Sequence, residues 1–181
     1  MECDSWKKQP VLTGEKVVLR PITPEDTDWI VKWRNTPSVR QNFIFRQPFT
    51  PEMHQGWMKN KVASGQVVQY IIQTAEAQKP VGSVYFRDLD PENDSAEYGI
   101  FIGEESARGQ GIGTETARLF VKYGLEVLGL HRISLRLLEG NEAAYRSYEK
   151  AGFVKEGIFR DMVKLDGKYR NVIFMAVLKD K

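Results

Sequence analysis

Two spacings of apolar residues alternate along this chain, and they predict its strands and helices. Short runs in which apolar residues alternate with polar ones, or follow one another directly, indicate strands. We expect strands at residues 17–22, 67–73, 81–86, 96–102, 131–138, 154–163 and 170–178. Apolar residues at steps of three and four indicate helices, which we expect at residues 24–35, 51–62, 112–128 and 142–151.

Start signals and turns support these elements. Threonine, proline and glutamate follow one another at residues 23–25 and again at residues 50–52, which places a cap, a proline and an acid at a helix start. Asn141 caps the last predicted helix. Short turns join the strands at residues 67–102 into an antiparallel meander, and the last two strands form a hairpin. We therefore expect an α+β protein with a poorly ordered N-terminal tail at residues 1–12 and a single domain at residues 13–181.

Composition narrows the class of protein. Of the 181 residues, 41% are hydrophobic and 28% are charged, as in ordinary globular domains. The net charge of +2, from 26 basic and 24 acidic side chains, gives no electrostatic reason to expect nucleic acid as a partner. One cysteine (Cys3) and two histidines (His54 and His131) favour neither a disulfide framework nor a metal site. Neither a membrane span nor a signal-peptide core is visible, so we expect a cytoplasmic protein.

The stretch with the clearest chemistry is residues 108–114, which lie between a predicted strand and the longest predicted helix. Three alternate glycines allow the main chain to approach a ligand without side-chain obstruction. The first turn of the following helix leaves N–H groups without partners, and the helix dipole favours negative charge there. This pattern predicts an anion site for a phosphate or pyrophosphate. The alternative is a glycine-rich turn with a purely structural role.

Spacing separates this turn from the common phosphate-binding motifs. A P-loop requires a lysine after its last glycine, and the dinucleotide motif requires Gly-x-Gly-x-x-Gly. Arg108, Gly111 and Gly113 instead match Arg/Gln-x-x-Gly-x-Gly/Ala, the acetyl-CoA pyrophosphate motif of the GNAT acyltransferases. Residues 141–153 resemble the Asn-x-x-Ala-x-x-x-Tyr-x-x-x-Gly-Phe signature of the same family. The resemblance covers roughly residues 17–178.

Three shorter stretches, at residues 19–21, 33–35 and 166–171, resemble the RimJ/RimL-type branch of this family. That branch includes acetyltransferases of ribosomal-protein N-termini, and its relatives act on spermidine and amino sugars. The resemblance implies a mixed, mostly antiparallel, twisted sheet of six or seven strands flanked by about four helices. This sheet is expected to splay open between the strands at residues 96–102 and 131–138.

The family implies that acetyl-CoA binds in this splayed gap as a co-substrate, without a metal. Main chain on the strand before the turn would pair with the pantetheine arm, N–H groups of the turn would hold the pyrophosphate, and an asparagine side chain would reach the pantetheine. These expected binding residues are Ile100, Phe101 and Ile102, then Arg108, Gly109, Gln110, Gly111, Ile112, Gly113 and Thr114, and finally Asn141. For Asn141 the alternative is helix capping alone, and both roles are compatible.

Acetyl transfer to an amine requires a neutral amine and a proton for the departing thiolate. An amine with a pKa of about 10.4 is mostly charged at pH 7. The resemblance places Tyr148 where a proton is donated to the coenzyme A sulfur; the alternative is a tyrosine packed in the core. Glu97 is the expected base, directly or through water, and its alternative is a solvated carboxylate at a strand end. His54 is expected to be structural and Glu104 to be solvated.

The expected function is therefore an acetyl-CoA-dependent N-acetyltransferase that acts on a primary amine by direct attack in a ternary complex. Three acceptors stay open: a protein N-terminus, a polyamine or an amino sugar. The expected partner is thus a small-molecule or peptide amine, with neither nucleic acid nor a membrane, and a homodimer is left open. The alternative is a non-catalytic acyl-CoA-binding or sensing module, since a fold alone does not establish function.

Overall fold

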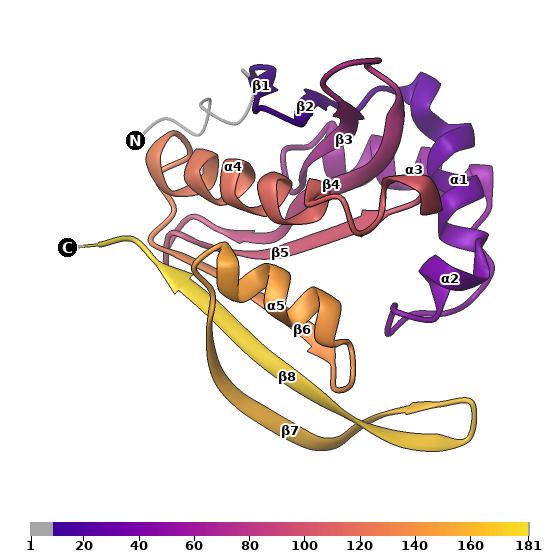
Figure 1. Ribbon diagram of the computed structural model, residues 1–181, viewed down its shortest axis with the longest axis vertical. Helices are drawn as coiled ribbons and strands as arrows, with labels where there is room; N and C mark the ends of the chain where they lie inside the picture. Colours follow the sequence, from indigo (N-terminus) through magenta and orange to yellow (C-terminus); the bar gives the residue numbers. More distant parts are fainter. Residues whose placement is uncertain (1–8, 181) are drawn as a thin grey trace.

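The fold is an eight-stranded sheet with helices on both faces (Figure 1). The computed structural model describes residues 9–180. The strand order is β1-β2-β3-β4-β5-β6-β8-β7, and neighbouring strands are antiparallel except for β5 and β6. The strands are β1 (Leu12–Thr13), β2 (Val17–Pro21), β3 (Val68–Thr74), β4 (Pro80–Asp90), β5 (Ser95–Ile102), β6 (Arg132–Leu138), β7 (Val154–Leu165) and β8 (Lys168–Leu178). The predicted α+β class and the mixed, mostly antiparallel sheet are confirmed.

The sheet has more strands than the six or seven expected, and the additional strand is β1. It pairs Leu12 with Leu19 and Thr13 with Val18 of β2. The sequence pattern places Leu12 in the N-terminal tail, because two residues are too few to show the alternation that marks a strand. Residues 1–8 of that predicted tail lie outside the described residues.

Within residues 9–180, five α-helices flank the sheet, one more than predicted. They are α1 (Thr27–Asn35), α2 (Pro37–Arg40), α3 (Pro51–Trp57), α4 (Ile112–Glu126) and α5 (Glu142–Lys150). The helix that was not predicted is α2. Pro37 follows the end of α1, where the sequence predicts a helix stop, but it also begins a new helix, since proline favours the first helical position. The predicted start of α3 is confirmed, since Thr50 Oγ1 accepts a hydrogen bond from the Met53 N–H at 3.2 Å.

Side chains that alternate along β3 divide the apolar core into two layers. Tyr70 faces α4, where its ring packs edge to face against Phe120 at 5.3 Å. The next residue, Ile71, points to the opposite face and packs in a cluster with Trp33 of α1 and Phe101 of β5. Figure 1 shows α4 and α5 together in front of the sheet and α1, α2 and α3 gathered at its right edge.

The strands β5 and β6 pair over a short distance and then separate. Residues 95–97 pair with residues 132–134, whereas β5 continues to Ile102 and β6 to Leu138. On its other side, β5 pairs with β4 up to Ile102. Main-chain groups of β5 beyond residue 97 that face β6 therefore have no strand partner there. The predicted splay is confirmed, and it positions the site.

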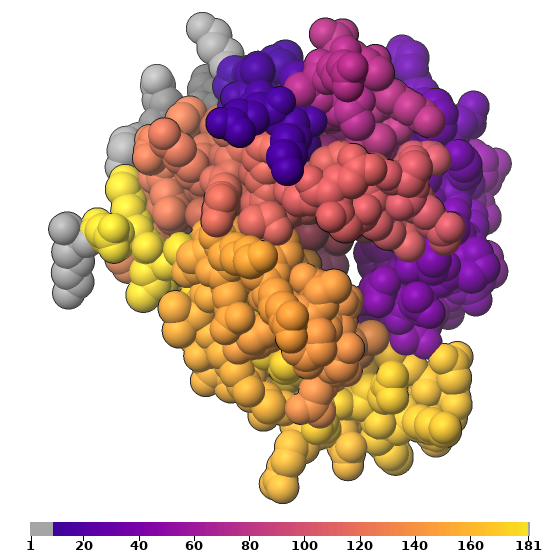
Figure 2. All heavy atoms as spheres, in the orientation of Figure 1, coloured from indigo at the N-terminus to yellow at the C-terminus, as the bar shows by residue number. Residues whose placement is uncertain are grey.

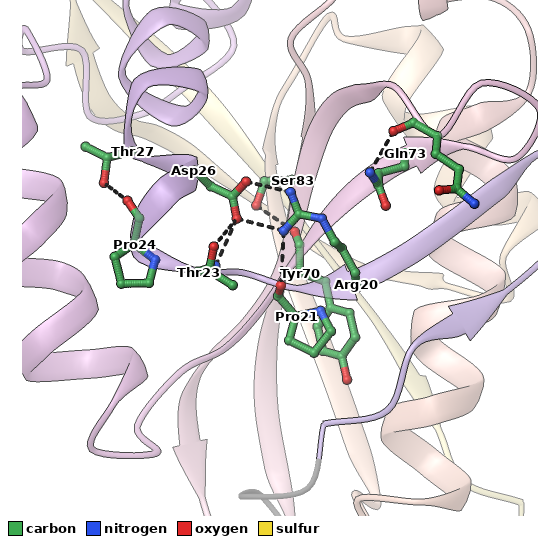
Figure 3. Close-up of polar contacts among 10 residues, drawn as sticks. Arg20, Pro21, Thr23, Pro24, Asp26, Thr27, Tyr70, Gln73 and Ser83 are labelled. Carbon is green, nitrogen blue, oxygen red and sulfur yellow. Dashed lines mark hydrogen bonds and ion pairs between the residues drawn. The ribbon is translucent and has the colours of Figure 1, made fainter.

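A partly buried ion pair fixes the direction in which the chain leaves β2 for α1 (Figure 3). Arg20 donates to the two carboxylate oxygens of Asp26 at 2.6 and 2.8 Å, and the Thr23 N–H donates to the same carboxylate at 2.9 Å. Burial raises the pKa of Asp26, but these hydrogen bonds and the Arg20 charge outweigh it, so the pKa lies below its ordinary value. The ion pair thereby orients α1, which carries Arg34 to the site and Trp33 to the core beside it.

Candidate active site

A cavity of about 1130 Å³ lies where β5 and β6 separate. It is lined by β4, β5, β6 and α5, by the turn before α4, and by α1, α3 and the loop that follows α2. Figure 2 shows a hollow in this region, between the orange atoms of α5 and the purple atoms around α2. Every site residue predicted from the sequence lines this cavity except Gln110 and Ile112. The side chain of Gln110 turns back to the Ser106 carbonyl and Ile112 is buried in the core.

The turn at residues 108–114 has the backbone that its glycines predict. Gly109 and Gly111 have φ angles of 72° and 81°, in the left-handed region. The first main-chain bond of α4 runs from the Glu115 N–H to the Gly111 carbonyl at 3.0 Å, so the N–H groups of the first three helical residues lack a helical acceptor. A Cβ atom added at Gly113 would find its nearest neighbour, Ser147 Oγ, at 3.9 Å. The turn therefore has free donors beside open space, which suits a phosphate.

A lysine that directly precedes β2 adds positive charge beside this turn. The Glu115 carboxylate accepts hydrogen bonds from the main-chain N–H groups of Glu15 at 2.5 Å and Lys16 at 3.0 Å. The Lys16 Nζ donates to the Gln110 carbonyl at 3.0 Å and would lie 3.3 Å from a Cβ atom at Gly111. No sequence pattern indicates Lys16, because almost a hundred residues separate it from the turn.

Main-chain groups of alternate residues on a strand point to the same neighbouring strand. The Phe101 carbonyl faces β4, since it lies only 2.3 Å from where a Cβ atom at Gly82 would be. The main-chain groups of Ile100 and Ile102 therefore face the splay. Arg108 already donates to the Ile102 carbonyl, from Nε at 3.2 Å and from Nη2 at 3.0 Å.

This geometry corrects one predicted contact. Phe101 was expected to offer main-chain groups to the pantetheine arm, but its register partner is Ser83 of β4. Its ring packs edge to face against Trp33 at 6.3 Å and against Phe43 at 5.6 Å. Phe101 therefore lines the cavity with its side chain, and Ile100 is the residue whose main chain is open to an extended ligand.

Asn141 caps α5 as predicted. Its Oδ1 accepts a hydrogen bond from the Ala144 N–H at 3.3 Å, and its Nδ2 lies 3.4 Å from Asn42 Oδ1. Asn42 belongs to the loop after α2, so the two asparagines bridge opposite walls of the cavity. The cap uses the amide oxygen and leaves the amide nitrogen on the cavity side.

Tyr148 projects from α5 into the cavity. Its ring packs edge to face against Tyr98 at 6.0 Å and Phe153 at 5.9 Å. Within residues 9–180, no hydrogen bond reaches its hydroxyl group. Burial raises the pKa of Tyr148 above its ordinary value of 10.0, and the nearby Tyr85 raises it further by a smaller amount. The phenol is therefore neutral at pH 7 and can donate a hydrogen bond to a group in the cavity.

Glu97 lies between two arginines. The register places Glu97 opposite Arg87 on β4 and opposite Ser134 on β6, and Arg136 follows two residues later on β6. Glu97 Oε1 accepts from Arg87 Nη2 at 2.5 Å, and Glu97 Oε2 lies 2.9 Å from Arg136 Nη2. The Glu97 side chain is only 17% exposed, so the alternative of a solvated strand-end carboxylate is wrong. A carboxylate has about four acceptor positions, so Glu97 keeps room for a further donor.

The two weaker candidates for a base are held elsewhere. His54 is fully buried at the α3 end of the cavity, with Nδ1 3.0 Å from Thr27 Oγ1. Its pKa is lowered by burial, which the charge of Asp26 only partly offsets. The prediction that Glu104 is solvated is wrong: it accepts hydrogen bonds from Trp33 Nε1 at 2.7 Å and from Lys32 Nζ at 2.9 Å, and thereby ties α1 to the end of β5.

Three arginines that line the cavity were not predicted from the sequence: Arg34, Arg87 and Arg136. They come from α1, β4 and β6, and only the register of the sheet and the packing of α1 bring them together. Residues 9–180 contain no cluster of three or more His, Cys, Asp and Glu side chains that could hold a metal. Over the same part of the chain, no helix has the length and apolar character to cross a membrane.

Comparisons with known proteins identify the family. The sequence model described as acetyltransferase (GNAT) domain matches residues 16–154. The chain is 28% identical over 167 residues to a spermidine N(1)-acetyltransferase of Escherichia coli (strain K12), covering 92% of this chain and 88% of the relative. It is 33% identical over 98 residues to the putative ribosomal N-acetyltransferase YdaF of Bacillus subtilis (strain 168), covering 54% and 53% of the two chains.

A solved structure shares the fold. Spermidine N-acetyltransferase from Vibrio cholerae, in complex with CoA and spermine, has a TM-score of 0.84 to this chain at 22% identity. The likeness covers 92% of this chain and 97% of that one. Since the family model spans most of the residues that form the sheet, the turn and α5, this chain belongs to the GNAT family of N-acetyltransferases.

Proposed function

We propose that this protein transfers the acetyl group of acetyl-CoA to a primary amine by direct attack in a ternary complex. The observation that carries the proposal is the single cavity that joins the turn at residues 108–114 to Tyr148 and Glu97. The co-substrate supplies an activated acetyl group at one end of this cavity. An amine that enters from the α1–α3 side would meet it between Tyr148 and Glu97.

The residues present suit this co-substrate. The free N–H groups at the start of α4 would bind the pyrophosphate, with the charge of Lys16 beside them. The main chain of Ile100 would pair with the pantetheine arm at the splay, and Asn141 would contact the same arm from α5. At the turn, the main chain alone would bind the pyrophosphate, so the glycines contribute by leaving space and not by a side chain.

Replacing Gly113 by valine should raise the dissociation constant of acetyl-CoA at least tenfold, about 1.4 kcal/mol. The 3.9 Å clearance to Ser147 allows the fold to accept a Cβ atom, but the new side chain would stand beside the N–H donors. Isothermal titration calorimetry measures the effect. Gly56→Val is the matched control, because Gly56 lies in α3, has no heavy atom within 4 Å of its added Cβ and does not line the cavity. A folded Gly113→Val variant with unchanged affinity would contradict the assignment.

The reaction moves one proton from the amine to the departing sulfur. We assign proton acceptance to Glu97, directly or through one water molecule, because its carboxylate faces the cavity and retains an acceptor position. We assign hydrogen-bond donation to Tyr148. The ordinary pKa of a tyrosine, about 10, already exceeds that of a thiol, about 8.5, and burial raises it further. The Tyr148 hydroxyl would therefore donate a hydrogen bond to the departing sulfur and keep its own proton. The proton that Glu97 takes from the amine passes to the thiolate and gives the free thiol.

A free-thiol release assay with acetyl-CoA and a panel of amines tests the proposed function. Thiol release that depends on an amine, with one acetyl group gained by that amine, is the expected result. Binding of acetyl-CoA without release for any amine would favour the alternative, a non-catalytic acyl-CoA-binding module on the same fold.

The relatives leave the class of acceptor open. One is named as a spermidine acetyltransferase and another as a putative ribosomal acetyltransferase. The second supports our proposal that this chain belongs to the RimJ/RimL-type branch, which includes acetyltransferases of ribosomal-protein N-termini and whose relatives act on spermidine and amino sugars. A homodimer also remains a proposal.

A further inference from the structure

The acceptor end of the cavity carries more positive charge than its carboxylate balances. Arg34, Arg87 and Arg136 all line it, and Glu97 is the one acidic side chain among the described residues that do. Arg87 and Arg136 share that carboxylate, at 2.5 and 2.9 Å. Among the lining residues, three guanidinium groups and one carboxylate leave a formal excess of two positive charges, and the Asp88 carboxylate, which lies outside the lining and near Arg87, reduces this excess to one.

Arg34 has no counter-ion within the described part of the chain. Its guanidinium lies over the ring of Phe43 at 4.0 Å and over that of Phe49 at 4.9 Å. The aromatic rings contact the faces of the guanidinium, whereas its N–H donors lie in its plane and remain available. Burial lowers the pKa of Arg34, Tyr85 opposes this effect, and the positive charge of Arg87 adds to it. An anion beside Arg34 would offset both the cost of burying its charge and the repulsion by Arg87.

Arg87 and Arg136 also keep unused donors. Each binds Glu97 through Nη2, no hydrogen bond among residues 9–180 uses the Nη1 atom of either, and their side chains are 35% and 30% exposed. The Arg87 Nε lies 3.6 Å from Asp88 Oδ2, but the Asp88 side chain is 73% exposed and does not line the cavity. Accessible guanidinium donors without partners can bind a ligand that supplies acceptor oxygens, so this cluster favours an anionic group.

We propose that the acceptor is an amine that also carries an anionic group, a carboxylate or a phosphate, and that Arg34 binds this group together with Arg87 and Arg136. The proposal rests on the proposed acetyl transfer. The amine lies at Glu97 and the anion at the guanidinium groups, so the charges of acceptor and site are complementary. Guanidinium groups bind carboxylates and phosphates through paired hydrogen bonds. A polyamine would place only positive charge against three arginines.

Matched acceptors that differ only in the anionic group test this proposal. Glucosamine 6-phosphate is compared with glucosamine and O-phosphoethanolamine with ethanolamine, which tests phosphate. Glycine is compared with glycinamide, which tests carboxylate, and spermidine represents the polyamines. We expect kcat/KM to be at least about tenfold higher for the anionic member of a pair, either in the phosphate comparison or in the carboxylate comparison. This is the ratio expected from one charge-assisted hydrogen bond. Spermidine should be a poorer substrate than that anionic amine.

Arg34→Met should remove this advantage. The methionine keeps apolar contact with Phe43 and Phe49 but loses the charge, so KM should rise about tenfold or more for the anionic acceptor and stay unchanged for its neutral partner. Arg34→Lys should restore part of the loss, because it keeps the charge without the paired donors. Arg40→Met is the control, since Arg40 lies on the neighbouring α2 and does not line the cavity.

Calorimetry with the same anionic amines and CoA-loaded protein gives a readout that needs no turnover. Binding that Arg34→Met abolishes supports the anion site; if no thiol is then released for any amine, acetyl transfer fails while the anion site stands. Three results overturn the anionic acceptor: a higher kcat/KM for spermidine than for every anionic amine, matched pairs that Arg34→Met leaves unchanged, or neither binding nor turnover of any anionic amine.

Discussion

Replacing Tyr148 by phenylalanine should lower kcat about 10²–10⁴-fold and leave the dissociation constant of acetyl-CoA nearly unchanged. The hydroxyl group acts only while the bond between carbon and sulfur breaks, so its loss affects the transition state and not the bound co-substrate. Phenylalanine keeps the ring contacts with Tyr98 and Phe153. Because no hydrogen bond within the described residues holds the hydroxyl group, the variant should fold normally. Single-turnover kinetics measure the chemical step directly.

The control for this variant is Tyr145→Phe on the same helix. Tyr145 does not line the cavity, so its kcat should equal that of the unmodified protein. Burial raises the pKa of Tyr148, and the neutral phenol is the form that donates. Ionisation of Tyr148 should therefore cause no loss of kcat in the unmodified protein as the pH rises to 10. If Tyr148→Phe keeps most of the single-turnover rate, Tyr148 has a packing role alone.

Replacing Glu97 by glutamine should reduce kcat/KM most at low pH, by about 10²-fold or more at pH 7. Glutamine can still accept a hydrogen bond from an arginine, but it cannot take a proton. For an amine with a pKa of about 10.4, the neutral fraction rises from under one in a thousand at pH 7 to about one in ten at pH 9.5. Part of the activity should therefore return above about pH 9. The pH profile of kcat/KM, with the affinity for acetyl-CoA unchanged, is the measurement.

Glu97→Gln also removes the charge shared by Arg87 and Arg136, so stability must be measured beside activity. We expect a loss of about 1–2 kcal/mol, below the 3–5 kcal/mol for fully buried pairs, because these two side chains are 35% and 30% exposed. Glu104→Gln is the control, as Glu104 holds Trp33 and Lys32 outside the cavity lining and should show no recovery at high pH. An equal loss at every pH would assign Glu97 to positioning of the amine.

Features that depend on residues close together along the chain could be predicted from the sequence. The left-handed backbone at Gly109 and Gly111 follows from glycine itself, and the caps at Thr50 and Asn141 follow from short polar side chains before a helix. Apolar periodicity over many residues gave α4 and the longer strands. The same reasoning missed β1 and α2, because two and four residues carry too little periodicity to be distinguished from a loop.

The charge around Glu97 was decided by the tertiary structure alone. The sequence identifies Glu97 as a carboxylate near a strand end and leaves two roles for it, a base or a solvated side chain. The register of three strands places Arg87 and Arg136 against it, and the packing of α1 brings Arg34 to the same cavity. These contacts join residues that are far apart along the chain, and Coulomb interactions depend on distance in space and on burial. The sequence therefore predicts a site for a co-substrate phosphate at the turn, whereas only the fold brings together the charged side chains that line the other end of the cavity.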